Sequence, residues 1–196
     1  MIRRTQAERS DETTGRLVLA ARELFGTHGY APTSIDAIAA AAGVTKGAAY
    51  HHFGGKGELF LAAFVAELEA VEARLLRVAT EESDPWAALR RGCRTFLEHC
   101  LDPRFRRIVL LDASSVLGWE RVREIEHDHM LRVLLDGLRV AVAAGQAPDG
   151  DLAARAQLAF GALCEGGMLL ARSEDPAADL PRIAAEADRF LAALKV

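Results

Sequence analysis

The sequence contains few cysteines and few prolines, and both shortages limit what the protein can be. Its 196 residues include three cysteines and six prolines. An odd, small number of cysteines within apolar helical patterns does not match the disulfide framework of a small secreted domain. We therefore expect Cys93, Cys100 and Cys164 to be reduced residues of the core.

Long hydrophobic runs are also absent. Apolar residues make up 51% of the chain, yet the longest uninterrupted runs are far shorter than the roughly 20 residues that a membrane-spanning helix needs. The opening MIRRTQAERSDE is basic at its start, but no apolar segment follows as in a secretion signal. This composition can fill one or two helical cores, and we expect a soluble, cytoplasmic protein.

Excess positive charge is lacking too, because the net charge is −4. The charge is divided unevenly: residues 1–60 carry +1 and the remainder carries −5. A near-neutral first part that begins with arginines permits local contact with phosphates in a chain that is acidic overall. The basic residues of this part are Arg3, Arg4, Arg9, Arg16, Arg22, Lys46 and Lys56.

The prolines and the apolar spacing predict an all-α fold. Asp84-Pro85 and Asp102-Pro103 each place a capping acid before a first-turn proline, which marks a helix start. Apolar residues recur at helical spacing, and no segment keeps the alternation of a strand. We predict about nine helices, at residues 11–28, 34–41, 45–52, 56–79, 85–101, 103–115, 118–144, 150–172 and 180–194.

The segment TSIDAIAAAAGVTKGAAYHHF, residues 33–53, predicts two short helices joined by a tight turn. Thr33 and Asp36 approximate a capping box at the start of the first helix. Gly43 supplies a position that tolerates left-handed geometry, and Thr45 can cap the second helix. Two short helices joined by a glycine-containing turn are typical of a helix-turn-helix unit, whose second helix enters the major groove of DNA.

The second helix of this unit carries side chains suited to DNA. Lys46 can reach a phosphate or a guanine edge, and Gly47 lets the backbone approach closely. The methyl group of Ala48 can meet a thymine methyl, and Tyr50 and His51 can donate hydrogen bonds to phosphate oxygens. This helix is therefore the expected reader of DNA.

Two further residues, Lys56 and His52, lie in or next to the helix that is expected to read DNA. Lys56 begins the next helix, where its ammonium and the free amide groups of the helix N-terminus can bind one phosphate. His52 is expected to be a solvated residue. A metal site at His51 and His52 is not expected, because adjacent helical residues point about 100° apart and no cysteine lies nearby.

Residues 11–60 resemble the TetR family of bacterial transcriptional regulators. The resemblance rests on Leu24-Phe25, Gly29-Tyr30, Thr33, Ile35, Ile38, Ala39, Ala42-Gly43-Val44, Tyr50, Phe53, Lys56 and Leu59. It implies that DNA is contacted by Thr33, Thr45, Lys46, Tyr50, His51 and Lys56. The sequence departs from the family pattern at Ala49, where a larger aliphatic residue is common, and at the glycines Gly54, Gly55 and Gly57.

The resemblance implies a DNA-binding domain at residues 1–55 and a ligand-binding and dimerisation domain at 56–196. In the family the last two helices, here 150–172 and 180–194, pair with their twofold mates. Their apolar stripes are Leu152, Ala156, Ala159, Leu163 and Gly166, and Ile183, Ala187, Phe190 and Leu194; a monomer core is the alternative role. A twofold dimer would set two reading helices about 34 Å apart on a palindromic site.

The resemblance also implies a cavity for a small-molecule effector among the middle helices. Its expected apolar lining is Trp86, Phe96, Cys100, Phe105, Ile108, Trp119 and Met130, and its expected polar groups are His99, Asp112, Glu124, His127 and Glu165. Ordinary core packing is the alternative for each apolar residue. Glu165, within AFGALCEGGMLLA, either faces a cavity, has a buried partner or reaches the surface.

The stretch EIEHDH, residues 124–129, supports an alternative, a helical metal- or ligand-binding protein that could be catalytic. Glu124 with His127 and Glu126 with His129 repeat the Glu-x-x-His spacing of di-iron bundles. Such a site needs a second Glu-x-x-His on another helix, and the sequence has none. Nucleophile elbows and Gly-rich phosphate loops are absent as well, so we predict no enzyme, no metal and no cofactor.

The resulting prediction is a homodimeric repressor that binds a palindromic operator and leaves it when an effector fills the second domain. The long helix 56–79 joins the two parts and is the expected route of coupling.

Overall fold

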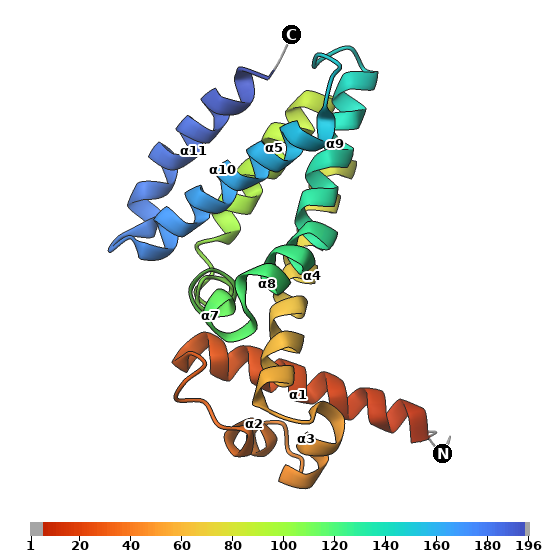
Figure 1. Cartoon of the computed structure of the whole chain (residues 1–196), viewed down its shortest axis with the longest axis vertical. Coiled ribbons are helices and arrows are strands. Elements are labelled where there is room, and N and C mark those ends of the chain that lie inside the picture. Colours follow the sequence, from red (N-terminus) through yellow and green to blue (C-terminus); the bar gives the residue numbers. More distant parts are fainter. Residues whose placement is uncertain (1–5, 195–196) are drawn as a thin grey trace.

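The computed structural model describes residues 6–194, and over this range the chain is helical with no strand (Figure 1). Arg3 and Arg4 lie outside the described residues. None of the helices within 6–194 has the length and apolar content needed to cross a bilayer. The elements are α1 (Gln6–His28), α2 (Ile35–Ala41), α3 (Lys46–Phe53), α4 (Lys56–Glu81), α5 (Pro85–His99), α6 (Pro103–Phe105), η1 (Arg106–Asp112), α7 (Ala113–Leu117), α8 (Trp119–Glu126), η2 (His127–Leu131), α9 (Arg132–Ala143), α10 (Leu152–Arg172) and α11 (Pro176–Ala192).

The prediction of an all-α chain with about nine helices is confirmed for the described residues. Two of the helical stretches are not regular α-helices, because each contains a π-helical section, η1 or η2. Apolar spacing did not predict these sections, since a π turn adds one residue without ending the helix. The stretch predicted as 118–144 is therefore divided into α8, η2 and α9.

The predicted start of the last helix, residue 180, is four residues late. The side chain of Asp175 caps α11 by accepting a hydrogen bond from the backbone N–H of Ala178 (3.0 Å), and Pro176 occupies the first turn. This is the pattern of Asp84-Pro85, so the same rule would have found it. Pro181 lies inside the helix, within its second turn.

The first three helices and the start of α4 form a compact head, at the bottom of Figure 1. Its core includes Phe25 of α1, whose ring packs edge-on against Phe60 of α4 with centroids 5.2 Å apart. Leu59 and Phe60 are both fully buried. Because α4 completes the head and then continues into the rest of the molecule, the division after residue 55 stays a prediction.

The predicted cap of α2 is wrong by one residue. Ser34 caps the helix by accepting a hydrogen bond from the N–H of Ala37 (3.1 Å). Thr33 is 5% exposed, and its hydroxyl donates to the carbonyl of Gly29 (2.8 Å). The side chain of Thr33 therefore closes the preceding turn instead of opening the helix.

The turn between α2 and α3 has the predicted geometry. Gly43 has a φ of +65°, which a residue with a Cβ rarely adopts. Thr45 caps α3 by accepting a hydrogen bond from the N–H of Ala48 (3.2 Å). The two short helices are consequently joined as in a helix-turn-helix unit.

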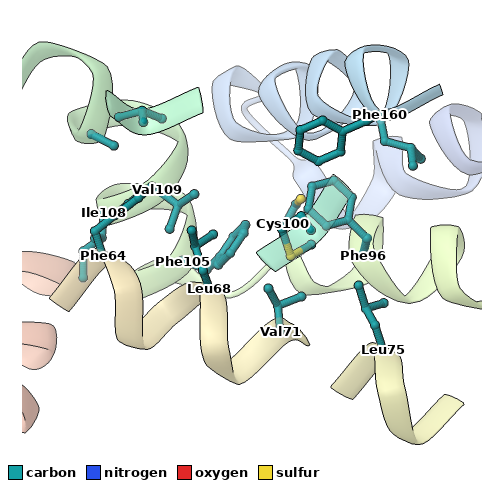
Figure 2. Packing of buried hydrophobic residues seen from close by; sticks show 14 of the residues in the cluster. Phe64, Leu68, Val71, Leu75, Phe96, Cys100, Phe105, Ile108, Val109 and Phe160 are labelled. Carbon is teal, nitrogen blue, oxygen red and sulfur yellow. The ribbon is translucent and has the colours of Figure 1, made fainter. Parts of the chain in front are cut away.

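The remaining helices form a larger body around a second part of the core (Figure 2). Figure 2 shows Phe64, Leu68, Val71 and Leu75 along α4, facing side chains of α5, α10 and the 103–112 stretch. Cys93 and Cys100 are buried, and Cys164 is half-buried; all three are free thiols, as predicted. Burial raises the pKa of the Cys93 thiol to about 12, so this group stays protonated.

The head is joined to the body at the turn after α1. The carboxylate of Asp112, the last residue of η1, accepts a hydrogen bond from the backbone N–H of Tyr30 (2.8 Å). A second link is the ion pair of Arg22 on α1 with Glu67 on α4 (2.9 Å), in which the glutamate side chain is 2% exposed. Both links oppose a movement of the head away from the body.

We predict that Asp112→Ala loosens this junction. The change leaves the half-buried N–H of Tyr30 without its acceptor, and we expect its amide hydrogen to exchange about tenfold faster or more. Hydrogen exchange followed by NMR measures this rate. Asp136→Ala, which removes an exposed carboxylate of α9, is the control, and equal rates in the two variants would contradict the assigned role of Asp112.

Candidate functional site

The outer face of α3 is open to solvent. Ala49 is fully buried and anchors the helix on the core, so the opposite face points to solvent. Lys46, Tyr50 and His51 are exposed on that face, together with Thr45 and Gly47, and Ala48 is half-buried. In Figure 1, α3 lies at the end of the molecule that is remote from the body. The expected reading residues of α3 therefore share one open surface.

Lys46 has a partner on the neighbouring helix. Its ammonium lies 2.9 Å from the carboxylate of Asp36 on α2, and both side chains are more than half exposed. The hydrogen bond with Asp36, followed by the charge of that carboxylate, raises the pKa of Lys46. Exposed pairs of this kind are weak, so a phosphate or a base edge can replace Asp36.

Lys56 has a different environment from the one expected. Its ammonium donates to the backbone carbonyls of Tyr30 (3.1 Å) and Ala31 (3.3 Å) and lies 4.1 Å from the centre of the Tyr30 ring. An ammonium has three N–H groups, and these contacts use two of them. The group expected to clamp a phosphate is therefore also an internal tie between α4 and the turn after α1.

The two histidines of α3 differ. His51 is exposed, whereas His52 is half-buried and its Nδ1 lies 3.2 Å from the hydroxyl of Thr14 on α1. The expectation that His52 is a solvated residue is wrong, because it links α3 to α1. Among residues 6–194, no three potential ligands converge as a metal site requires.

Two of the cavities in the body are neighbours. The larger, of about 350 Å³, lies between α4, α5 and α9, and the smaller, of about 130 Å³, is bounded by α5, α8 and α10. Phe96, Met130 and Phe160 line both. Of the expected ligand residues, Phe96 and Met130 line both cavities, and Phe105 and Trp119 line the smaller one.

Three expected apolar residues are core residues instead. Trp86 and Ile108 are buried, and Cys100 is fully buried beside Gly167. None of them lines either of these two cavities. The sequence pattern did not separate cavity from core, because both require apolar side chains at the same helical spacing.

The five expected polar ligand groups also lie elsewhere. Asp112 holds the junction with the head, Glu124 and Glu165 are exposed, and His127 faces Gln157 (3.3 Å). His99 packs edge-on against Phe105, with centroids 4.7 Å apart, and burial lowers the pKa of its imidazole. Within the described chain the Nε2 atom of His99 is buried without a hydrogen-bond partner.

The polar group that does reach the smaller cavity was missed. Arg123 and Glu126, one helical turn apart on α8, form an ion pair of 3.1 Å at its wall, and the thiol of Cys164 lies 3.7 Å from Arg123. The sequence does carry a signal, an Arg and a Glu at i and i+3 that overlap the EIEHDH stretch. The prediction instead followed the Glu-x-x-His spacing, which pairs Glu124 with His127 and Glu126 with His129.

The Glu-x-x-His pairs do not assemble a metal site. Glu126 binds Arg123, and the Nδ1 of His129 lies 2.7 Å from a carboxylate oxygen of Glu72 on α4. The π-helical section begins at His127, which changes the direction of the side chains that follow. The geometry therefore gives the metal alternative no support.

The predicted apolar stripe of α10 faces inward, whereas that of α11 is divided, with Ile183 buried and Phe190 exposed. Ala156, Ala159, Leu163 and Gly166 are buried, and a Cβ on Gly166 would lie 3.1 Å from Leu97. The monomer core is thus the correct role for this stripe. A second apolar face points to solvent, with Leu158 71%, Leu169 52% and Phe190 45% exposed.

Comparison with known proteins relates both parts of the chain to the same family of regulatory proteins. Residues 17–63 match the family model of bacterial regulatory proteins of the tetR family. Residues 86–194 match the model of the tetracyclin repressor-like C-terminal domain.

Individual relatives agree with these models. The HTH-type transcriptional regulator TtgR of Pseudomonas putida is 34% identical over 175 residues, which cover 85% of this chain and 82% of that protein. The crystal structure of a TetR-family transcriptional regulator from Pectobacterium atrosepticum superposes with a TM-score of 0.86, at 34% identity and 98% coverage of both chains. The chain matches 63% of the length of the Transposon Tn10 TetC protein of Escherichia coli, at 32% identity over 64% of its own residues.

We predict that Lys56→Met destabilises the folded protein although Lys56 lies beside the exposed reading surface. The change removes two hydrogen bonds from an ammonium, and because the group is half-buried we expect a loss of about 1 kcal/mol. Urea unfolding followed by circular dichroism measures it. Lys46→Met, which removes an exposed pair, should leave the midpoint unchanged, and an equal effect of the two substitutions would contradict the internal tie.

Proposed function

Because the chain belongs to the TetR family of bacterial transcriptional regulators, we propose that it binds operator DNA through the outer face of α3. The observation that carries the proposal is the orientation of α3, with Ala49 inward and Lys46, Tyr50 and His51 outward. Membership in this family also makes the chain a regulator and not an enzyme. A regulator that binds DNA works in the cytoplasm, and we include that location in the proposal.

Each exposed residue of the proposed interface has a distinct role. Lys46 leaves Asp36 and binds a phosphate or a guanine edge, and Tyr50 and His51 donate to phosphate oxygens. Thr45, Gly47 and Ala48 form the edge that approaches the groove. Lys56 contributes its third N–H to a phosphate while it keeps its two internal bonds. Thr33 is left out of the interface, because its side chain is buried and its hydroxyl donates within the head.

We propose a homodimer formed by the outward faces of α10 and α11. Leu158, Leu169 and Phe190 are exposed there, on two helices that pack side by side at one edge of the body (Figure 1). Exposed apolar side chains gathered on one face are typical of an interface between proteins. A twofold axis through this face would place two copies of α3 on the two halves of a palindromic operator.

We further propose that a small molecule in the body releases the DNA, which makes the protein a repressor. The smaller cavity is bounded partly by Val109 and Leu110 of η1, and Asp112 at the end of η1 holds the N–H of Tyr30 in the head. A ligand that favours another position of η1 therefore acts directly on the head. By linkage, a ligand that binds better to the released form weakens DNA binding by the same factor.

We predict that Lys46→Met weakens DNA binding and reduces its dependence on salt. A duplex selected from a random library by the wild-type protein serves as the operator. If Lys46 neutralises one phosphate, the slope of log affinity against log salt should fall by about 0.9 per protomer. Fluorescence anisotropy at several salt concentrations measures both quantities. Arg139→Met on α9, remote from the head, is the control, and a Lys46 variant with unchanged affinity and slope would contradict the interface.

We predict that Leu158→Lys combined with Leu169→Lys yields a monomer. The two substitutions place charges in an apolar interface without partners, which is strongly unfavourable. Size-exclusion chromatography with light scattering gives the mass, and operator affinity should fall together with it. Val140→Lys changes another exposed apolar residue, on α9, and should keep the dimer. A double variant that remains dimeric would rule out this face.

A further inference from the structure

The smaller cavity has the size and lining of a site for one aromatic ring. Its volume is about 130 Å³, slightly less than the roughly 150 Å³ of an apolar cavity that binds benzene, so a single ring is the largest guest that it can hold without some movement of its lining. Phe96 and Phe105 meet edge to face in its wall, with centroids 6.3 Å apart, and Phe160 closes another side. Figure 2 shows these rings converging from α5, the start of the 103–112 stretch and α10.

The lining also contains flexible sulfur groups. Met130 of η2 and Met168 of α10 both border the cavity. Thioethers adapt to irregular shapes and make favourable contacts with the edges of aromatic rings. The apolar part of the wall therefore favours a flat aromatic guest.

One end of the cavity is polar and strongly organised. The guanidinium of Arg123 lies 3.1 Å from a carboxylate oxygen of Glu126, and its central carbon is 4.9 Å from the centre of the Phe160 ring. The two side chains are 19% and 13% exposed. A carboxylate and a guanidinium thus meet the guest at the same point, in a place largely withdrawn from water.

This ion pair selects the charge of the guest. Burial raises the pKa of Glu126, and the charge of Arg123 opposes the effect. An anionic guest on Arg123 would place a second carboxylate beside Glu126, and one of the two would have to take up a proton. A cationic guest on Glu126 would meet the charge of Arg123. A neutral hydroxyl avoids both penalties, because its O–H can donate to Glu126 while its oxygen accepts from Arg123.

We propose that this cavity is a binding site for a neutral, single-ring phenol, with the ring between Phe96, Phe105 and Phe160 and the hydroxyl on the Arg123 and Glu126 pair. The binding site is argued from the lining of the cavity and the ion pair alone. Its role as the effector site, in contrast, rests on the proposed function.

Calorimetric titration of the wild-type protein with phenol, toluene and benzoate tests the chemistry. We expect saturable binding of phenol. Toluene should bind about tenfold more weakly or worse, because it lacks the hydrogen bonds to charged groups. Benzoate should also bind more weakly than phenol, because its charge meets Glu126.

Tryptophan fluorescence locates the bound molecule. The chain has two tryptophans, and only Trp119 lines the cavity. In Trp86→Phe, phenol should change the emission of Trp119 with the affinity measured by calorimetry. An unchanged emission would place phenol elsewhere and overturn the site.

Variants of the ion pair give the sharpest test. Arg123→Met should lower phenol affinity about tenfold or more but leave toluene affinity unchanged, which also shows that the cavity is intact. Glu126→Gln should weaken the selection against anions, so that benzoate binds better than it does to the wild type. Arg121→Met, an exposed arginine of the same helix, is the matched control and should change nothing.

Besides an unchanged emission of Trp119, four results would overturn the phenol site: no phenol binding to the wild-type protein, equal affinities for phenol and toluene, tighter binding of benzoate than of phenol, or no effect of Arg123→Met on phenol binding. The link with DNA is tested separately. If phenol binds but operator affinity is unchanged, the effector role fails while the DNA-binding proposal stands. If phenol binds and the wild-type protein binds no DNA, the proposed function fails while the site remains.

Discussion

The backbone of Tyr30 is the point on which the arrangement of the molecule depends. Its N–H is held by Asp112 of the body, and its carbonyl is held by Lys56 at the start of α4. Its ring packs edge-on against Phe60, with centroids 5.2 Å apart. One residue is therefore bound to the body, to the connecting helix and to the core of the head. This turn therefore helps to fix the direction of α3 relative to the body.

The irregular helical sections lie between this turn and the cavity. Val109 and Leu110 of η1 and Met130 of η2 border the smaller cavity, and η1 ends at Asp112. Short π-helical sections within a helix are frequent at functional sites. A guest among these residues thus acts on the part of the helix that controls Tyr30. Helix α4 is the second connection, through the buried pair of Glu67 and Arg22.

Local sequence signals predicted most of the fold and the surface of the reading helix. Capping acids before prolines, the apolar spacing and Gly43 were sufficient, because each acts within a few residues. Contacts between distant segments were not predictable in this way. The ammonium of Lys56 turns to carbonyls 25 and 26 residues earlier, and the stripe of α10 that contains Gly166 faces its own core, since Leu97 and Ile183 happen to lie there. The pair of Arg123 and Glu126 was visible, but only the packing of α10 against α8 turns it into the wall of a cavity.

The pairing of Lys46 with Asp36 has a consequence for how the protein moves along a chromosome. If Lys46 contacts DNA as proposed, every encounter with random sequence would displace the carboxylate before the lysine holds a phosphate, and the displaced carboxylate would then repel the backbone. Affinity for arbitrary sites would be lowered by the same small amount everywhere, whereas a matched base edge would compensate for it at one place. The protein would then slide and hop along DNA with short residence times at nonspecific sites.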